Sequence, residues 1–321
     1  MIDPSLLLWC DRSNRDRWRL HGPDRAKFLH NYCTNDIKKL TPGSGCEAFV
    51  TSPQGKTIGY ISALATEDSL LVRTDAGAFS RISPHFLKYG VFDDVAWTDV
   101  RESTFEIHLT GAHTDSLLAR LGLPIPGPRD LDNSSTSAGD RPLLVVREAP
   151  LGTPGYSILG SLEDRKPFLA SMHEAHGTSL RELTAQEVDG LRIAAGVPVF
   201  GLDITPENLP QEIGRDARTI NFVKGCYLGQ ETVARLDALG HVNKLLMGLR
   251  VSSGDTPRPH DTLLANGVPA GAVTSSGYSP RDDRPVALAF VRIKHAPSGT
   301  IVSWDEDGRT GVGEVYQLPT P

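Results

Sequence analysis

Residues Lys224 to Arg235 read KGCYLGQETVAR, the densest polar and glycine-rich stretch flanked by apolar residues in the chain. Two glycines and a cysteine precede a predicted helix that begins near Cys226 and carries Gln230 and Glu231 in its first turns. A cysteine at a helix N-terminus lies near unpaired N–H groups, which favour the thiolate. Lys224 and Arg235 would lower the pKa of that thiol further. The alternative is a buried structural cysteine between loop and helix, because free cysteine is commonly buried.

The residues before this stretch alternate between short strands and helices. Period-two patterning predicts strands at 57–64 and 69–74, and apolar spacings of three or four predict a helix over 76–89. A further helix is predicted over 163–176. Thr184-Ala185-Gln186-Glu187 has the form of a capping box, which begins a helix that ends near Ala195. These patterns predict an α+β body over residues 1–243.

One segment of this body has the composition of a loop. Residues 124–142 contain four prolines and a run of serine, threonine and asparagine. Such a segment buries too little apolar area to offset its ordering cost, so it predicts a flexible surface loop.

The character of the sequence changes after Asn243. Short apolar runs are separated by glycine, proline, asparagine and aspartate, which is typical of a small antiparallel barrel. The runs lie at 245–251, 268–273, 286–291, 301–304 and 312–318. The chain is therefore predicted to have an α+β body followed by an all-β domain over residues 244–321.

Composition argues against several classes of protein. The net charge of −6 over 321 residues disfavours a sequence-independent nucleic-acid binder, which needs a basic face. The four arginines between residues 12 and 19 are interrupted by acids and are interpreted as a solvated or strand-flanking segment. No window reaches the roughly 18 apolar residues that span a bilayer. Widely spaced cysteines and histidines predict neither a disulfide framework nor a metal site, and indicate a reducing, cytoplasmic compartment.

The motif Lys-Gly-Cys-Tyr-x-Gly-Gln-Glu resembles the hallmark of the YgfZ family. That family is related to the aminomethyltransferase (T-protein) of the glycine cleavage system. The resemblance extends over nearly the whole chain. Similar segments are Gly22-Pro23-Asp24, Phe28-Leu29, Thr34-Asn35-Asp36, Pro53-Gln54-Gly55-Lys56, Lys88-Tyr89-Gly90-Val91-Phe92, Leu191-Arg192-Ile193-Ala194-Ala195-Gly196-Val197-Pro198 and Asn243-Lys244.

The resemblance implies a three-domain ring around a central channel that binds tetrahydrofolate. Two intertwined ferredoxin-like α+β subdomains and a C-terminal antiparallel β-barrel would form the ring. Cys226 would be the functional cysteine, Lys224 would lie at the channel, and Arg192 would meet the pterin or glutamate end of the folate. The residues implied to bind the cofactor are Lys224, Gly225, Tyr227, Gly229, Gln230, Glu231, Arg235 and Arg192.

The resemblance implies a monomeric protein that supports the assembly or maintenance of iron–sulfur enzymes, including those that thiomethylate tRNA. The alternative is a tetrahydrofolate-dependent aminomethyl or one-carbon transferase, and a third possibility is a folate-binding scaffold without chemistry of its own. Two departures bear on this choice. Tyr60 aligns with the catalytic aspartate of the T-protein, and a phenol of pKa about 10 cannot replace a carboxylate ionised near neutrality. Ala194 replaces the glutamate of the Arg-x-Glu-Ala-Gly segment.

Overall fold

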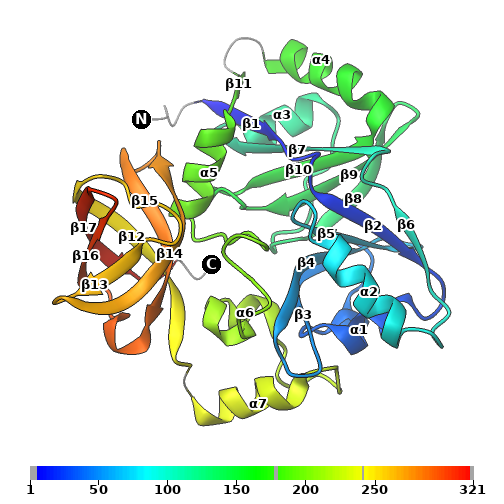
Figure 1. Cartoon of the computed structure of the whole chain (residues 1–321). Helices are drawn as coiled ribbons and strands as arrows, with labels where there is room; N and C mark the ends of the chain where they lie inside the picture. The colour runs from blue at the N-terminus through cyan, green and yellow to red at the C-terminus, as the bar shows by residue number, and fades with distance from the viewer. Residues whose placement is uncertain (1–5, 177–179, 241, 319–321) are drawn as a thin grey trace.

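Three lobes meet around a central region, as Figure 1 shows for the computed structural model, which describes residues 6–176, 180–240 and 242–318. Two lobes are α+β layers and the third is a β-barrel. Each lobe buries an apolar core of its own. A further apolar cluster joins the lobes, with Phe49 from the first, Ile193 from a connecting helix and Leu288 from the barrel.

The first lobe is a five-stranded sheet with the strand order β3-β4-β5-β2-β6, covered by α1 and α2. Its elements are β2 Asp16–His21, α1 Arg25–Tyr32, β3 Gly45–Thr51, β4 Thr57–Ala65, β5 Leu70–Thr74, α2 Phe79–Tyr89 and β6 Ala96–Asp99. The helices pack against each other and the sheet through aromatic rings; the centroids of Phe28 and Phe86 lie 5.3 Å apart. This packing buries one face of the sheet and leaves the other toward the centre of the molecule.

The second lobe is a six-stranded sheet with the order β11-β1-β7-β10-β9-β8. Its elements are β1 Leu7–Asp11, β7 Thr104–Gly111, α3 Thr114–Arg120, β8 Asn133–Ala138, β9 Arg141–Glu148, β10 Gly155–Ser161, α4 Arg165–His176 and β11 Leu180–Glu182. Strand β1 pairs with β11 in parallel and with β7 antiparallel. The chain therefore starts in this sheet, builds the first lobe and returns, so the two α+β lobes are intertwined as predicted.

The third lobe is a closed antiparallel barrel in which β12 pairs with both β15 and β17. Its strands are β12 Lys244–Gly254, β13 Thr262–Ala265, β14 Val268–Ser279, β15 Arg284–Arg292, β16 Ile301–Glu306 and β17 Arg309–Tyr316. Alternating apolar residues point inward, and Trp304 is fully buried among them. The predicted barrel is confirmed; β13 is the strand that the sequence patterns did not predict.

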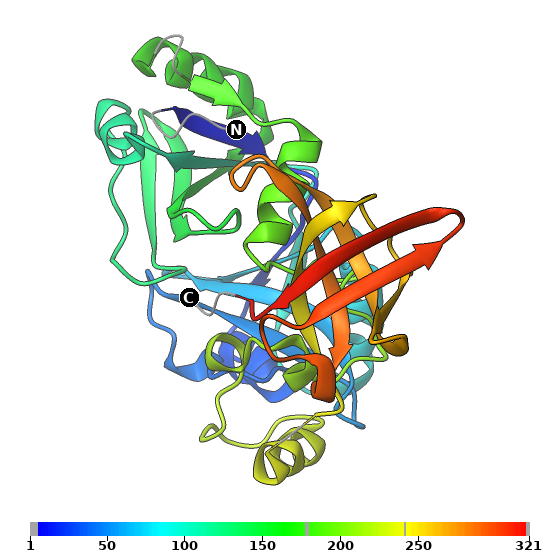
Figure 2. The same cartoon turned by 90° about the vertical axis from the view of Figure 1, so that its left-hand side faces the viewer.

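Three helices connect the α+β lobes to the barrel: α5 Ala185–Ala194, α6 Asp216–Thr219 and α7 Gln230–Leu239. Helix α5 begins with the predicted capping box between Thr184 and Glu187. It packs against β14 and β15, as both views show (Figure 1, Figure 2). Among the described residues, no helix combines the length and apolar character that crossing a membrane requires.

The prediction of a loop over residues 124–142 is wrong in its second half. Residues Asn133 to Ala138 form β8, an edge strand that pairs with β9 from Asn133 opposite Val146 to Ala138 opposite Arg141. The turn between the strands contains Gly139 at φ +63, a conformation that glycine adopts without strain. Edge strands need little apolar surface because the ladder itself satisfies their backbone groups, so composition alone did not reveal β8.

Candidate functional site

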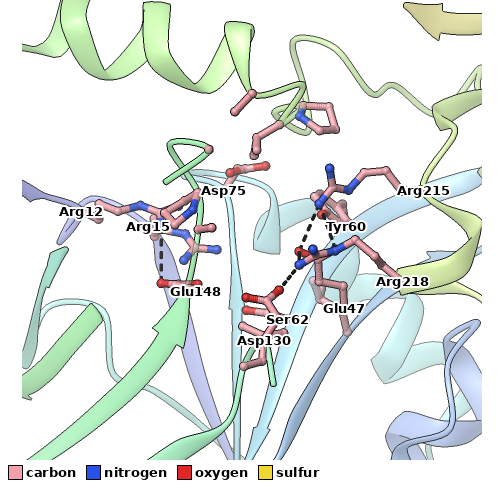
Figure 3. Close-up of a pocket in the computed structure, with 18 residues that line it drawn as sticks. Arg12, Arg15, Glu47, Tyr60, Ser62, Asp75, Asp130, Glu148, Arg215 and Arg218 are labelled. Carbon is pink, nitrogen blue, oxygen red and sulfur yellow. Dashed lines mark hydrogen bonds and ion pairs between the residues drawn. The ribbon is translucent and has the colours of Figure 1, made fainter. Parts of the chain in front are cut away.

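A cavity of about 220 Å³ lies between the two α+β lobes and the segment that follows α5. We call it the central pocket. Figure 3 shows two groups of charged side chains facing each other across it. One group comes from the β1–β2 turn and the end of β9, and the other from β3, β4 and α6. The labelled lining residues are Arg12, Arg15, Glu47, Tyr60, Ser62, Asp75, Asp130, Glu148, Arg215 and Arg218.

On the α6 side of the pocket, Glu47 is held by two arginines. Arg218 Nε lies 2.9 Å from Glu47 Oε2, and Arg215 Nη2 lies 3.2 Å from the same oxygen. Burial alone would raise the pKa of Glu47, but the two guanidinium groups outweigh it and lower the pKa to about 2. Arg218 also pairs with Asp130. This side therefore carries fixed charges at neutral pH.

Tyr60 lies beside this cluster on β4. Its ring is tilted against Phe49 at 5.3 Å between centroids, and the guanidinium carbon of Arg215 lies 5.9 Å from the ring centre. Burial raises the pKa of Tyr60, so its hydroxyl is neutral at physiological pH. The tyrosine consequently offers the pocket a hydroxyl group and an aromatic face, and no carboxylate.

On the opposite side, Glu148 is held by a buried arginine. Arg73 Nη2 lies 2.9 Å from Glu148 Oε2, and Arg73 Nη1 lies 3.1 Å from both Glu148 Oε1 and Glu106 Oε1. Arg12 Nη1 lies 3.5 Å from Glu148 Oε1. Burial opposes ionisation of Glu148, but the arginines lower its pKa well below the usual range. Buried charges of this kind persist only when they are paired.

Two of the arginines that line the pocket have a buried Nε without a hydrogen-bond partner among the described residues. In the part of the chain that the structure describes, Nε of Arg15 and Nε of Arg215 are buried without a hydrogen-bond partner. They lie on opposite sides of the pocket. The guanidinium groups of Arg12, Arg15, Arg215 and Arg218 nevertheless line the cavity and place positive charge around it. The arrangement thus suits a polar ligand that carries negative charge.

Asp75 lies between the two charged groups and follows directly after β5. Its Oδ2 accepts a hydrogen bond of 2.7 Å from the backbone N–H of Phe200. Burial raises the pKa of Asp75, and the positive charge of Arg15 opposes part of that rise. Asp75 was not among the residues predicted from the sequence.

Of the two interpretations of residues 12–19, the solvated segment is wrong, whereas the strand-flanking segment agrees with the structure, because Arg12 and Arg15 lie between β1 and β2. The side chain of Arg17 is fully buried, and Arg12 and Arg15 line the central pocket. The sequence around Arg12 and Arg15 does not indicate that they are buried, because the acids that pair with them, Glu148 and Glu106, come from strands distant in the sequence. Arg215 and Arg218 could have been noticed as two arginines three residues apart; in the structure Arg215 directly precedes α6 and Arg218 lies within it.

Lys224 of the sequence motif does not line the central pocket. Its Nζ is buried and donates to three backbone carbonyls, at 2.6 Å to His30, 2.7 Å to Cys33 and 2.8 Å to Asn35. The ammonium group also lies 4.8 Å from the ring centre of buried Tyr227. Lys224 therefore fastens the motif to the C-terminal end of α1.

Gly229 allows the motif to pack closely against the first lobe. Gly229 has φ +87, and a Cβ there would lie 2.3 Å from the carbonyl oxygen of Ser52. The preceding residue, Leu228, forms two hydrogen bonds with the first lobe. Its carbonyl accepts one from Thr51 Oγ1, and its N–H donates one to the carbonyl of Asn31. Because Gly229 is in the left-handed region, α7 begins at Gln230 and not near Cys226 as predicted. Cys226 accordingly lies in the loop before the helix, and the argument that the helix N-terminus activates its thiol does not apply.

The remaining predicted residues lie away from the pocket lining. Gly225, Cys226, Glu231 and Arg235 are exposed, and Gln230 is half-buried. Arg192 is buried at the junction between α5 and the barrel, where it contacts Asp189, Asp203 and Ser275 at 2.6, 2.9 and 3.1 Å. The motif and the pocket are thus two separate places in the fold. They are connected through Asn35, whose side-chain amide donates to the carbonyls of Glu47 and Arg218.

The chain matches two family models: the GCVT N-terminal domain over residues 7–223 and the glycine cleavage T-protein C-terminal barrel domain over residues 244–320. A chloroplast protein of Arabidopsis thaliana, provisionally named a transferase, is 27% identical over 96% of this chain and 70% of its own length. The aminomethyltransferase of Thermus thermophilus is 28% identical over 88% of this chain and 78% of its own.

A solved structure has the same fold. It is the glycine cleavage system aminomethyltransferase T of Bartonella henselae, with a TM-score of 0.86, 19% identity, and coverage of 98% of this chain and 86% of that one.

Proposed function

Because the chain belongs to the glycine cleavage T-protein family, we propose that it binds a reduced folate in the central pocket and acts as a folate-dependent transferase. The observation that carries the proposal is the pocket itself, which is lined by four arginines. Folate has acidic glutamyl groups and a polar heterocycle, and guanidinium groups bind carboxylates strongly through paired hydrogen bonds. Relatives named aminomethyltransferases favour transfer over the accessory role that the motif predicts.

Tetrahydrofolate should bind at one site, and calorimetry on the full chain measures this directly. At a ligand concentration one hundred times the dissociation constant, binding would stabilise the protein by about 2.7 kcal/mol. Arg218→Gln, which removes a pocket charge, should weaken binding by at least about tenfold, the effect of losing one charged contact. Arg235→Gln removes an exposed charge from the motif helix and should leave binding unchanged. The reverse pattern would move the folate site to the motif and contradict the proposal.

A turnover assay separates transfer from binding alone. If the protein is a transferase for the aminomethyl group, tetrahydrofolate should accelerate ammonia release from aminomethylated carrier protein. Tyr60 in place of an ionisable acid predicts a rate well below that of a true T-protein, because a neutral phenol is a poor base near neutrality. Folate binding without any acceleration would reject aminomethyl transfer and leave the accessory function.

The exposure of Cys226 favours a second candidate function. Of the four cysteines, all free, Cys10 and Cys33 are buried, Cys46 is half-buried and Cys226 is exposed. A thiol held at the surface by a buried lysine and a tightly packed glycine fits a YgfZ-type protein that supports iron–sulfur enzymes through this cysteine. Complementation of a strain that lacks its own YgfZ-type protein tests the idea; full rescue by Cys226→Ala would reject it.

Cys226 should be alkylated by iodoacetamide at least about tenfold faster than the other cysteines in the folded protein, because the exposed thiolate is the reacting species. Burial raises the pKa of Cys10 to about 11 and also raises the pKa values of Cys33 and Cys46. Mass spectrometry of each cysteine peptide gives the four rates. The same reaction in guanidinium chloride is the control, in which the four rates should converge. Equal rates in the folded protein would contradict the expected selectivity.

A further inference from the structure

Three of the four carboxylates that line the central pocket are occupied by arginine. Glu47 pairs with Arg215 and Arg218, Asp130 pairs with Arg218, and Glu148 is held on both oxygens by Arg73. Asp75 differs from them. Among the residues that the structure describes, it forms no ion pair within 4.0 Å, and its side chain has one hydrogen bond, from the Phe200 N–H. A carboxylate has about four acceptor positions, so most of the capacity of Asp75 is unused.

The position of Asp75 is fixed by two parts of the chain. Its own carbonyl accepts the N–H of Ala78 at 3.1 Å at the start of α2, while its Oδ2 is held by Phe200 from the segment after α5. That segment also contributes Val197 and Pro198 to the pocket lining. A rigidly placed acceptor beside apolar groups is how proteins orient a flat polar ring.

We propose that Asp75 accepts the paired N–H donors on the pyrimidine edge of a pterin ring bound in the central pocket. This proposal rests on the proposed folate binding. The edge of a pterin presents the 2-amino group and the ring N3–H side by side, and a carboxylate matches two parallel donors in the way that it matches a guanidinium group. The 4-oxo oxygen next to these donors needs a donor from the protein, and Arg15, which lines this side of the pocket, carries guanidinium N–H groups.

The burial of the Asp75 carboxylate agrees with its proposed role as an acceptor for the ligand. Burial raises its pKa despite the nearby Arg15, because one backbone N–H does not replace the water that the carboxylate loses. Two ligand N–H groups would satisfy the remaining acceptors. Glu47 and Glu148, which are largely removed from solvent, could accept these donors only by giving up an arginine, which is costly at buried sites. Asp130 is exposed and pairs with Arg218.

The test is calorimetry with two ligands and three proteins. The ligands are tetrahydrofolate and its analogue with a methyl group in place of the 2-amino group. Wild type should bind tetrahydrofolate about 10–100-fold more tightly than the analogue, the value of one charged hydrogen bond. Asp75→Asn should lose most of this discrimination, because the amide replaces one acceptor by a donor. Asp140→Asn, an exposed aspartate in the β8–β9 turn, is the matched control and should behave as wild type.

The outcomes separate the two proposals. If wild type binds tetrahydrofolate but does not distinguish it from the analogue, the role of Asp75 is overturned and folate binding stands; this readout needs no variant. Unchanged discrimination by folded Asp75→Asn has the same consequence. If wild type binds neither ligand, the proposed function fails and the role of Asp75 fails with it.

Discussion

Arg73→Met is expected to lower the free energy of unfolding by about 3–5 kcal/mol, the cost of removing one partner from a buried ion pair. Arg73 is fully buried and bridges the two α+β lobes, from β5 in the first to Glu106 and Glu148 in the second. Methionine keeps most of the side-chain volume of Arg73, but Glu106 and Glu148 each lose a guanidinium group that pairs with their carboxylate. Urea unfolding at pH 7 measures the loss. Arg284→Met, at an exposed arginine of the barrel, should change stability by less than about 0.5 kcal/mol.

The pH dependence of this loss identifies its electrostatic origin. In wild type the pKa of Glu148 lies well below its usual value of 4.5, so the ion pair stabilises the fold at neutral pH and is lost only in strong acid. Without Arg73, Glu148 should take up a proton near or above its usual pKa. The stability difference between wild type and variant should therefore narrow as the pH falls below about 4.5. A difference that stays constant with pH would indicate a packing defect and contradict the charge argument.

Lys224→Met is expected to destabilise the protein by about 3 kcal/mol, because three buried carbonyls lose a charged donor. Those carbonyls belong to His30, Cys33 and Asn35, so the C-terminal end of α1 should loosen first. The side chain of Lys224 is buried, and this burial lowers the pKa of its ammonium group. Chemical unfolding gives the magnitude, and hydrogen exchange of the α1 amides gives the location.

Lys38→Met is the matched control, since Lys38 is exposed in the short 3-10 helix that follows α1, and its loss should cost less than about 0.5 kcal/mol. The folded fraction of Lys224→Met should bind tetrahydrofolate as wild type does, because Lys224 is outside the pocket lining. A stable variant with lost folate affinity would instead support the cofactor-binding role that the family resemblance implies for this lysine.

Local patterns in the sequence determined much of the fold. The capping box at Thr184 and Glu187 predicted the start of α5 because both of its hydrogen bonds lie within one turn. Helix α4 was also predicted, and most of the barrel strands followed from short apolar runs separated by turn-forming residues. The lengths and order of these elements thus depend on interactions between residues near each other in the sequence.

The sequence also drew attention to the motif at 224–231, but it did not tell which residues of the motif bind and which support. The sequence shows a lysine at position 224, but it does not show whether the ammonium group contacts a ligand or three backbone carbonyls. The start of α7 was missed for a related reason. Gly229 has a left-handed backbone conformation directly before the helix, and the carbonyl of Ser52, which is distant in the sequence, leaves no room for a Cβ at this position.

Only the tertiary structure decided the central pocket. Its charged residues come from the β1–β2 turn, β3, the residue after β5, the loop before β8, β9 and the start of α6, so they are distributed over residues 12–218. Their partners are set by strand pairing across two intertwined sheets, which also determines that Glu47, Asp130 and Glu148 are paired while Asp75 keeps open acceptor positions. The sequence by itself thus determined most of the elements and the relation to the glycine cleavage T-protein. The three-dimensional packing determined the site, because electrostatic partnership depends on distance in space and leaves no periodic trace along the chain.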